Sequence, residues 1–415
     1  MIRRFNAAGG FVRALLALLA ALLVGAVVIA LAQRDVSAPL TAYAALLKGA
    51  VGSAQGWSQT LDRTMPILLT GVGVAVALAA GLFNIGAEGQ LAVGGLASAV
   101  VGYSFPGLPA PLLLLLAMLA GMLGGAAWAY LPALLKEKRG AHEVITAILL
   151  NYIARNTTKY LASVSPPRGF KDPTSGGVQR TPEVAATFPR LFGDFDVHLG
   201  LVVAVVAVVA VAVLLRRTVW GYETRAVGEG AGAAEAAGIR VSRVRIVAML
   251  VSGALCGLAG AVEILGPTRY RAFPADFYGA GFGFDGLAVA LLAGGSPWAV
   301  LPSALLFGIL GSGAEIMEFE ADTPKQIVAV VQALVIVAVA ARIVGRKRAA
   351  TTPAAPPAVP PAIEGPSRTE SVADACLTLP RSSRPPSGSG PHSGSRPWGA
   401  SFRSAPASST SDLRR

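Results

Sequence analysis

The sequence predicts an all-α protein, a polytopic membrane bundle of about ten transmembrane helices. Hydrophobic residues make up 53% of the 415 residues and charged residues only 14%, whereas soluble domains carry about 25% charged residues. Residues 89–135 contain no Asp, Glu, Lys or Arg, and about 20 apolar residues suffice to cross a bilayer. These observations exclude an ordinary water-soluble enzyme.

The first predicted span, residues 14–32, is an uninterrupted run of apolar or small residues that follows three arginines. A cleaved signal peptide would have an apolar region of about 7–15 residues followed by a small-residue cleavage site. This run is longer and continues into the polar residues 33–35. We therefore expect it to be retained as a span.

Nine further spans are predicted between charged residues and turn residues. Breaks at 104–109 (SFPGLP) and 294–297 (GGSP) each divide a long apolar run into two crossings, because Pro and Gly interrupt helices. In one span Arg155 and Lys159 must face protein, water or the interface, since both are costly against lipid. The nine spans are 65–83, 86–103, 111–134, 142–162, 198–215, 246–264, 277–293, 298–316 and 326–342.

The distribution of basic residues predicts that both termini are cytoplasmic. Segments predicted to face inward hold 16 Lys and Arg in 54 residues, and those predicted to face outward hold ten in 98. This contrast follows the positive-inside rule and requires an even number of spans between the basic loops. The inward segments are 1–13, 136–139, 216–245 and 342–348, and the outward ones are 34–63, 103–110, 164–196, 266–284 and 318–325.

Two parts of the chain are expected, a transmembrane domain at 1–345 and a tail at 346–415. The tail is rich in Pro, Ser and Arg, and such a composition buries too little apolar surface to fold. We expect it to be disordered and cytoplasmic, or to be an out-of-frame extension without function. Half of the net charge of +12 lies in this tail, so the charge does not indicate nucleic-acid binding.

Motifs for hydrolysis or energy coupling are missing from the sequence. It contains no phosphate-binding loop, no HExxH and no GxSxG pattern. Its two cysteines and three histidines have no metal-binding spacing. We therefore expect neither an enzyme nor a metal site, and no cofactor in this chain.

The segment 81–90 (GLFNIGAEGQ) places Asn84, Glu88 and Gln90 in an apolar region. Broken backbone at membrane depth is tolerated only against protein or a water-lined cavity, so this segment is a candidate element of a transport pathway. The alternative is a cytoplasmic turn, with Glu88 near a helix N-terminus where the dipole favours an acid.

The segment 140–155 is a second candidate. His142 and Glu143 follow a basic run, and Asn151, Tyr152 and Arg155 lie farther along the same predicted helix. Asn151 and Arg155 are four residues apart and so share a face that needs polar partners. A solvated helix start would explain His142 and Glu143 equally well.

Phe284 and Asp285 lie in a third candidate, the glycine-dense segment 279–286 (GAGFGFDG). It is typical of a half-helix start whose backbone amides face a polar cavity. Asp285 could instead be a helix cap.

The predicted inward segment 216–245 suits docking to a soluble partner, although a plain linker is an alternative. Its alanine-rich part should form a short helix that ends at Gly238. We expect this helix to begin only after Gly232, because a glycine inside a helix costs about 1 kcal/mol. The candidate docking residues are Gly221, Tyr222, Arg225, Ala226, Gly228, Ala233, Ala234, Glu235, Ala236, Ala237 and Gly238.

Taken in order, these segments resemble the permease subunits of bacterial ABC importers for ribose-type sugars, branched-chain amino acids and nucleosides. Segments 81–90, 140–153 and 283–292 are similar above all to the signature stretches of the nucleoside branch. The resemblance covers about residues 10–345 and excludes the tail. The chain departs from the common pattern at 229–232 (EGAG), where the family is more polar.

The resemblance implies a ten-span permease in the bacterial cytoplasmic membrane. Its implied partners are a cytoplasmic ABC ATPase that binds ATP and Mg, a second permease forming a heterodimer, and an extracytoplasmic substrate-binding lipoprotein. Residues 222–239 would be the coupling element, with 233–238 seated in the ATPase. Asn151, Tyr152 and Phe284 could contact a nucleoside, because a flat base and a ribose need aromatic faces and hydrogen-bonding groups.

Three other interpretations stay open at this point. The first is a permease of the same superfamily for ribose-type sugars or branched-chain amino acids. The second is an ion-coupled secondary transporter that uses Glu88 or Asp285 near the midplane. The third is a structural membrane scaffold.

Overall fold

The computed structural model describes residues 19–333 except 194, 196, 268, 325 and 331. Within these residues the regular structure is helical, with only two isolated β-bridges. After an initial helix, Leu19–Gln33, the elements are α2 Ala38–Val51, α3 Ala54–Ala79, α4 Ala87–Ser104, α5 Ala110–Arg139, α6 Glu143–Ser163, α7 Gly200–Arg217, α8 Val219–Glu229, α9 Ala231–Ala236, α10 Val241–Leu265, η1 Phe277–Ala280, α11 Phe282–Leu292 and α12 Pro297–Glu320.

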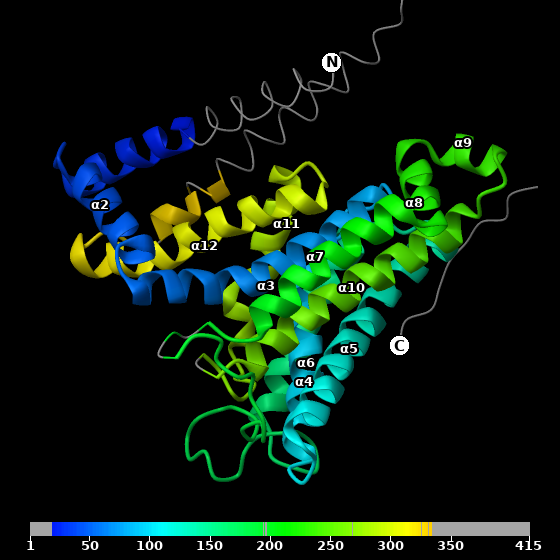
Figure 1. Cartoon of the computed structure of the whole chain (residues 1–415), viewed down its shortest axis with the longest axis horizontal. Helices are drawn as coiled ribbons and strands as arrows, with labels where there is room; N and C mark the ends of the chain where they lie inside the picture. The colour runs from blue at the N-terminus through cyan, green and yellow to red at the C-terminus, as the bar shows by residue number, and fades with distance from the viewer. Residues whose placement is uncertain are drawn as a thin grey trace, which may run out of the picture. The chain divides into compact units, whose positions relative to one another are not determined.

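Helix α10 packs against α3, α4 and α5 (Figure 1). Glycines make this close approach possible: a Cβ at Gly257 would collide with the carbonyl oxygen of Gly121, and one at Gly260 with the carbonyl oxygen of Leu91. Small residues at helix interfaces let backbones come together where lipid gives no hydrophobic drive for association. The α4–α5–α10 contact is therefore set by backbone surfaces rather than by large side chains.

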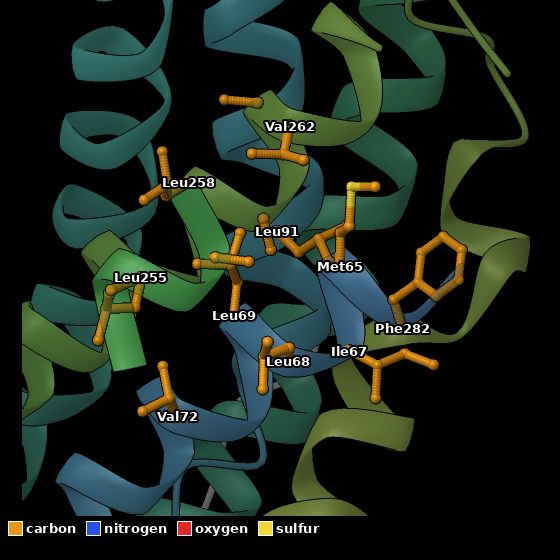
Figure 2. Close-up of a cluster of buried hydrophobic side chains, with 14 of the residues drawn as sticks. Met65, Ile67, Leu68, Leu69, Val72, Leu91, Leu255, Leu258, Val262 and Phe282 are labelled. Carbon is orange, nitrogen blue, oxygen red and sulfur yellow. The ribbon is translucent and has the colours of Figure 1, made fainter. Parts of the chain in front are cut away.

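Large apolar side chains fill the space on the other side of α10. Figure 2 shows residues of α3 interleaved with residues of α10 and with Phe282 at the start of α11. Met65, Ile67 and Leu69 are fully buried there. This part of α3 is consequently enclosed by protein along most of its length.

Five of the described helices, namely α3, α5, α7, α10 and α12, are long and apolar enough to cross a membrane. A sixth candidate is the pair formed by Leu19–Gln33 and α2, which is bent by 118°. The outer surfaces of α5 and α7 are lined by leucine and valine side chains. The chain is therefore a multi-pass membrane protein.

The described helices follow the predicted spans most closely at α4, α5, α6, α7 and α12. Two differences stand out. Segment 34–63, predicted as an outward loop, contains α2 and the start of α3, whose Ser53 cap accepts the Gly56 amide. Predicted span 277–293 is divided at Gly281, whose φ is +74°. Most of span 326–342 and the whole tail 346–415 lie outside the described residues.

Opposite ends of α10 contact different predicted loops. At its start, Arg245 lies 3.6 Å from Glu137 of the predicted inward segment 136–139. At its end, the Leu265 carbonyl accepts the amide of Phe188 from the predicted outward segment 164–196. The predicted inward and outward segments are thus separated by the length of α10, with α8 and α9 beyond its start (Figure 1).

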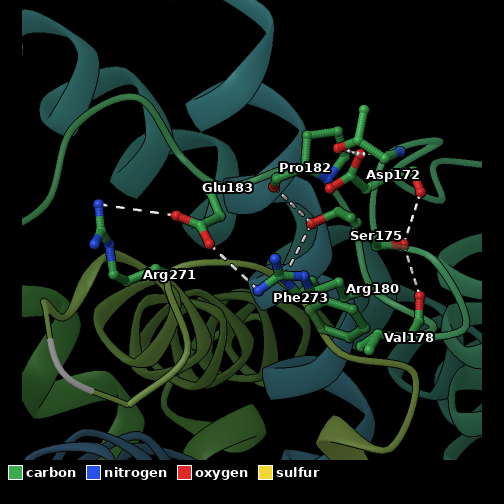
Figure 3. Close-up of polar contacts among 10 residues, drawn as sticks. Asp172, Ser175, Val178, Arg180, Pro182, Glu183, Arg271 and Phe273 are labelled. Atoms are coloured by element: carbon green, nitrogen blue, oxygen red, sulfur yellow. Dashed lines mark hydrogen bonds and ion pairs between the residues drawn. The ribbon is translucent and has the colours of Figure 1, made fainter.

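The predicted outward segment 164–196 is ordered by polar contacts with the segment that follows α10 (Figure 3). Glu183 lies 3.3 Å from Arg180 and 3.9 Å from Arg271, and the Thr181 hydroxyl accepts the Phe273 amide. Within the loop, the hydroxyl and the backbone amide of Thr174 hold the pKa of Asp172 below its usual value. The loop and residues 269–276 therefore form one structure at this end.

We expect Gly257→Val to destabilise the bundle, because the added side chain would meet the backbone of α5. Overpacking of this kind costs about 1–3 kcal/mol. Thermal unfolding of the detergent-purified chain measures the loss. Gly107→Ala is the control, since a Cβ there meets open space. Equal unfolding temperatures for both variants would contradict the packing described for α10.

Candidate functional site

The centre of the bundle contains a break in the helical structure between α3 and α4. Residues 80–86 connect the two helices, and Gly81 takes a left-handed conformation, with φ of +73°. The break contacts the middle of α6 through Asn151 and the middle of α10 through Ser252. Irregular backbone is thus enclosed by protein, as it must be inside a membrane.

A pair of buried amides holds the two sides of the break together. Asn84 Nδ2 donates to Gln90 Oε1 and to Ser252 Oγ, both at 2.8 Å. Gln90 Nε2 donates in return to Asn84 Oδ1 at 3.0 Å. All three side chains are fully buried. A satisfied network in such surroundings makes the local backbone rigid.

Helix α6 satisfies further polar groups of the break. Asn151 Oδ1 accepts the Gly89 amide at 3.0 Å, and its Nδ2 donates to the Ile85 carbonyl at 3.0 Å. Glu143 Oε1 accepts the Phe83 amide at 3.2 Å, and the other carboxyl oxygen of Glu143, Oε2, pairs with Lys136. The polar face predicted for this helix therefore serves, at Asn151, to bind the break.

Glu88 joins the beginning of α4 to the beginning of α11. Its Oε2 accepts the amide of Gly283 at 2.6 Å and that of Phe284 at 3.3 Å. The residue is fully buried, and its Oε1 has no hydrogen-bond partner among the described residues. A Cβ at position 283 would collide with the Glu88 backbone, so glycine is required there. An acid at a helix N-terminus is favoured by the free amides and by the dipole.

The arrangement therefore brings two interrupted helices together at one carboxyl group. Thr70 Oγ1, from the interior of α3, donates to the Phe282 carbonyl at 3.0 Å and fixes the first turn of α11 to that helix. Interrupted helices that meet near the midplane are typical of membrane transporters. Asn84, Glu88, Gln90, Glu143 and Asn151 all belong to this junction.

The side chains of the remaining predicted site residues make no contact in the junction, although the Phe284 amide does. His142 is exposed and contributes its backbone carbonyl to the start of α6. The side chain of Tyr152 is 59% exposed and that of Phe284 is 47% exposed, while Asp285 is half-buried. These four residues are accessible on the surface of the single chain, unlike the amides at its centre.

A charged cluster that the sequence analysis missed surrounds Phe282. The guanidinium carbons of Arg63 and Arg269 lie 5.7 and 5.3 Å from the centre of its ring. Around them are ion pairs between Arg63 and Glu315 and between Arg269 and Glu263, at 3.7 and 4.0 Å. A carboxyl oxygen of Asp62 lies 3.2 Å from Nε2 of His198. The signal in the sequence was Glu263, an acid within a predicted span. Among the described residues no His, Cys, Asp and Glu group could hold a metal ion.

The predicted docking segment 216–245 contains α8 and α9 between the end of α7 and the start of α10. Thr218 Oγ1 caps α8 by accepting the Gly221 amide at 3.0 Å, and Arg225 Nε donates to the Gly221 carbonyl. The prediction that the helix begins only after Gly232 was wrong. The alanine-rich helix is α9, which begins at Ala231, before Gly232. It directly follows Gly230, whose extended backbone (φ −172°) separates it from α8.

One side of α8 and α9 packs against the bundle, and the other side is exposed. Val227 and Ala234 pack against Val244 of α10, and Gly228 contacts the backbone of Ala79 and Gly81 at the start of the break. Gly238, with φ of +85°, ends the turn by donating to the Glu235 carbonyl. Among the predicted docking residues, Gly221 and Ala234 are buried and Ala226 is half-buried. The exposed ones are Tyr222, Arg225, Gly228, Ala233, Glu235, Ala236, Ala237 and Gly238.

The structure is a multi-pass bundle with interrupted helices at its centre and an exposed helix of small residues at one end. This is the architecture of a membrane permease. Residues 56–340 match the family described as the branched-chain amino acid transport system / permease component. The chain belongs to this family. No solved structure matches it.

Relatives with nucleoside and sugar transport names match most of the chain. The guanosine ABC transporter permease protein NupP of Bacillus subtilis is 37% identical over 79% of this chain and 92% of that protein. The glucose permease TsgB13 of Haloferax volcanii is 37% identical over 77% and 84%. The nucleoside permease NupB of Lactococcus lactis is 35% identical over 74% and 85%.

Bacillus subtilis and Lactococcus lactis each contain a second permease that is less similar to this chain. The guanosine permease NupQ of Bacillus subtilis and the nucleoside permease NupC of Lactococcus lactis are 26% and 28% identical, each over 61% of this chain.

We expect Glu88→Ala to destabilise the junction, because the amides of Gly283 and Phe284 lose their acceptor in a buried position. An unsatisfied buried group costs about 1–3 kcal/mol. Glu88→Gln, which retains an acceptor oxygen, should lose less. Thermal unfolding of the purified chain measures both, with Asp276→Ala, at an exposed acid near η1, as the control. A Glu88→Ala variant as stable as Asp276→Ala would contradict the role given to Glu88.

Proposed function

We propose that the chain is the permease subunit of an ATP-driven ABC importer for nucleosides in the bacterial cytoplasmic membrane. The observation that carries the proposal is 35–37% identity, over most of the chain, to permeases named for guanosine and for nucleosides. Ten spans with both termini in the cytoplasm complete the proposal. Support for that orientation comes from the basic segments at the α8–α9 end of α10 and from the less basic ones at the other end.

The proposed partners follow from the two ends of the bundle. A cytoplasmic ATPase, which binds ATP and Mg, docks on the exposed face of α9 around Glu235. A substrate-binding lipoprotein delivers the nucleoside at the end formed by the outward loop and residues 269–276. The lipid bilayer surrounds α5 and α7. ATP hydrolysis itself belongs to the ATPase chain.

The second permease is proposed to be a different chain, so that the transporter contains a heterodimer. The support is the pairing among relatives. In two organisms the chain matches one nucleoside-type permease at 35–37% identity and another at 26–28%. Two sequence classes within one organism are what a heterodimer requires.

In the proposed mechanism, movement of the docked ATPase passes through α8 into the centre of the bundle. Gly228 rests on Ala79 and Gly81, so a displacement of α8 reaches the break directly. The break leads into the first turn of α4, where Glu88 holds the beginning of α11. ATP can drive this change only by binding the two conformations with different affinity. Tilting of the break and of α11 would then open the route to one side at a time.

A sugar is the second candidate substrate, because the glucose permease TsgB13 is also 37% identical. An ion-coupled carrier is less well supported, since one oxygen of the Glu88 carboxyl group, Oε2, already accepts two amides of α11.

Uptake by cells with and without this gene tests the function. We expect loss of radiolabelled nucleoside uptake in the deletion strain and in a strain that lacks the ATPase partner, with ribose, glucose and leucine uptake unchanged. Loss of sugar or leucine uptake instead would assign the chain to a different substrate. Uptake that survives ATPase deletion and collapses with an ionophore would mean an ion-coupled carrier.

Glu235→Lys tests the docking surface, because it reverses an exposed charge on α9 without touching the core. We expect nucleoside uptake to be abolished, while the amount of membrane-inserted chain and its thermal unfolding stay unchanged. Co-purification of the ATPase with the variant is the direct measurement. Normal uptake and normal co-purification would fit a plain linker and remove α9 from the coupling mechanism.

A further inference from the structure

Two kinds of exposed surface occur at bilayer depth on this chain. The sides of α5 and α7 that are exposed on this chain are uniformly apolar at this depth, and such surfaces suit contact with lipid. Their exposed large side chains include Leu112, Leu115, Leu119, Leu123, Val202, Val205, Val206, Val209 and Val213.

One stripe of α6 is different. Tyr152, Arg155, Asn156 and Lys159 are all exposed, and their spacing of three, four and seven residues places them on one helix face. Arg155 lies near the middle of the helix Glu143–Ser163. An arginine at the bilayer centre costs about 2.5–3.5 kcal/mol even on the mildest scale. This stripe is therefore unsuited to lipid.

The stripe continues onto η1, the short helix that precedes α11. The guanidinium carbon of Arg155 lies 5.7 Å from the ring centre of Tyr278 in η1. The junction explains why these elements are neighbours: Asn151 binds the amide of Gly89, while the adjacent Glu88 binds the amide of Phe284. Helices α6 and α11 thus bind two adjacent residues of α4, α6 through the Asn151 side chain and α11 through the Phe284 amide.

The accessible groups of this surface have the chemistry that a nucleoside requires. Phe284 and Tyr152 expose aromatic rings, and stacking on aromatic side chains accommodates any nucleobase. Asp285 follows Phe284 in α11 and is half-buried, and the exposed Arg155 lies 5.7 Å from the ring centre of Tyr278. An acceptor and a donor for ribose hydroxyls thus accompany the aromatic rings. The buried amides of Asn84 and Gln90, in contrast, already bind each other.

We infer that Tyr152, Arg155, Tyr278, Phe284 and Asp285, together called the polar wall, line a water-filled route in the assembled transporter and contact the nucleoside. This inference rests on the proposed function. It separates two roles: the buried residues of the junction position the helices, and the polar wall touches the substrate.

Cysteine accessibility in the complete transporter tests the polar wall. The parent carries Cys256→Ser and Cys376→Ser, and single variants Tyr152→Cys and Phe284→Cys are compared with Val206→Cys and Leu123→Cys on the apolar faces. A charged, water-soluble methanethiosulfonate is applied to right-side-out and inside-out vesicles. We expect both wall positions to react at least about tenfold faster than both apolar positions, and saturating guanosine to slow them severalfold.

Each other outcome has a definite meaning. Wall positions that react as slowly as Val206→Cys would show that lipid or packed protein covers them, which overturns the inference. Fast reaction at the wall positions that guanosine does not slow would show that these residues do not contact the substrate, which also overturns the inference. Nucleoside uptake by the parent is measured in the same cells. Absence of uptake would contradict the proposed function, whereas slow labelling with uptake intact would contradict only the inference about the polar wall.

Discussion

The bond from the Glu88 carboxyl group to the first amides of α11 is the interaction on which the centre of this protein depends. Free amides at a helix start cannot be left without partners inside a membrane, so α11 can begin there only because α4 presents an acceptor. The same logic applies to the break itself. Glu143 binds the Phe83 amide, and Asn151 binds both the Gly89 amide and the Ile85 carbonyl. Each polar side chain replaces a bond that a continuous helix would have made for itself.

The close packing around α10 serves this arrangement. Ser252 reaches Asn84 only because α10 lies against α4 and α5 with glycines at the contacts. Contact between Gly228 and Ala79 then links the surface segment to the same centre. Rigid elements that meet in one small region can transmit a displacement, because packed interiors do not deform continuously.

Hydropathy and turn residues predicted most helices well, because a long apolar run inside a membrane forms a helix that satisfies its own backbone hydrogen bonds. They missed α2, because residues 38–51 follow a polar turn and carry Lys48, which pairs with Glu320 far along the chain. The polar character of segment 81–90 could be recognised, but the partners could not, because Asn84 and Ser252 are 168 residues apart. Glycine propensity misplaced the start of α9, because Gly230 rather than Gly232 adopts the extended backbone.

Reconstitution tests the central claim most directly. The chain is purified with its second permease and the ATPase, placed in liposomes with the substrate-binding lipoprotein on the side opposite the ATPase, and supplied with radiolabelled guanosine. The account predicts guanosine accumulation above the external concentration only when ATP and Mg are present on the ATPase side. Equilibration without ATP, or no guanosine movement while another solute accumulates, would contradict it.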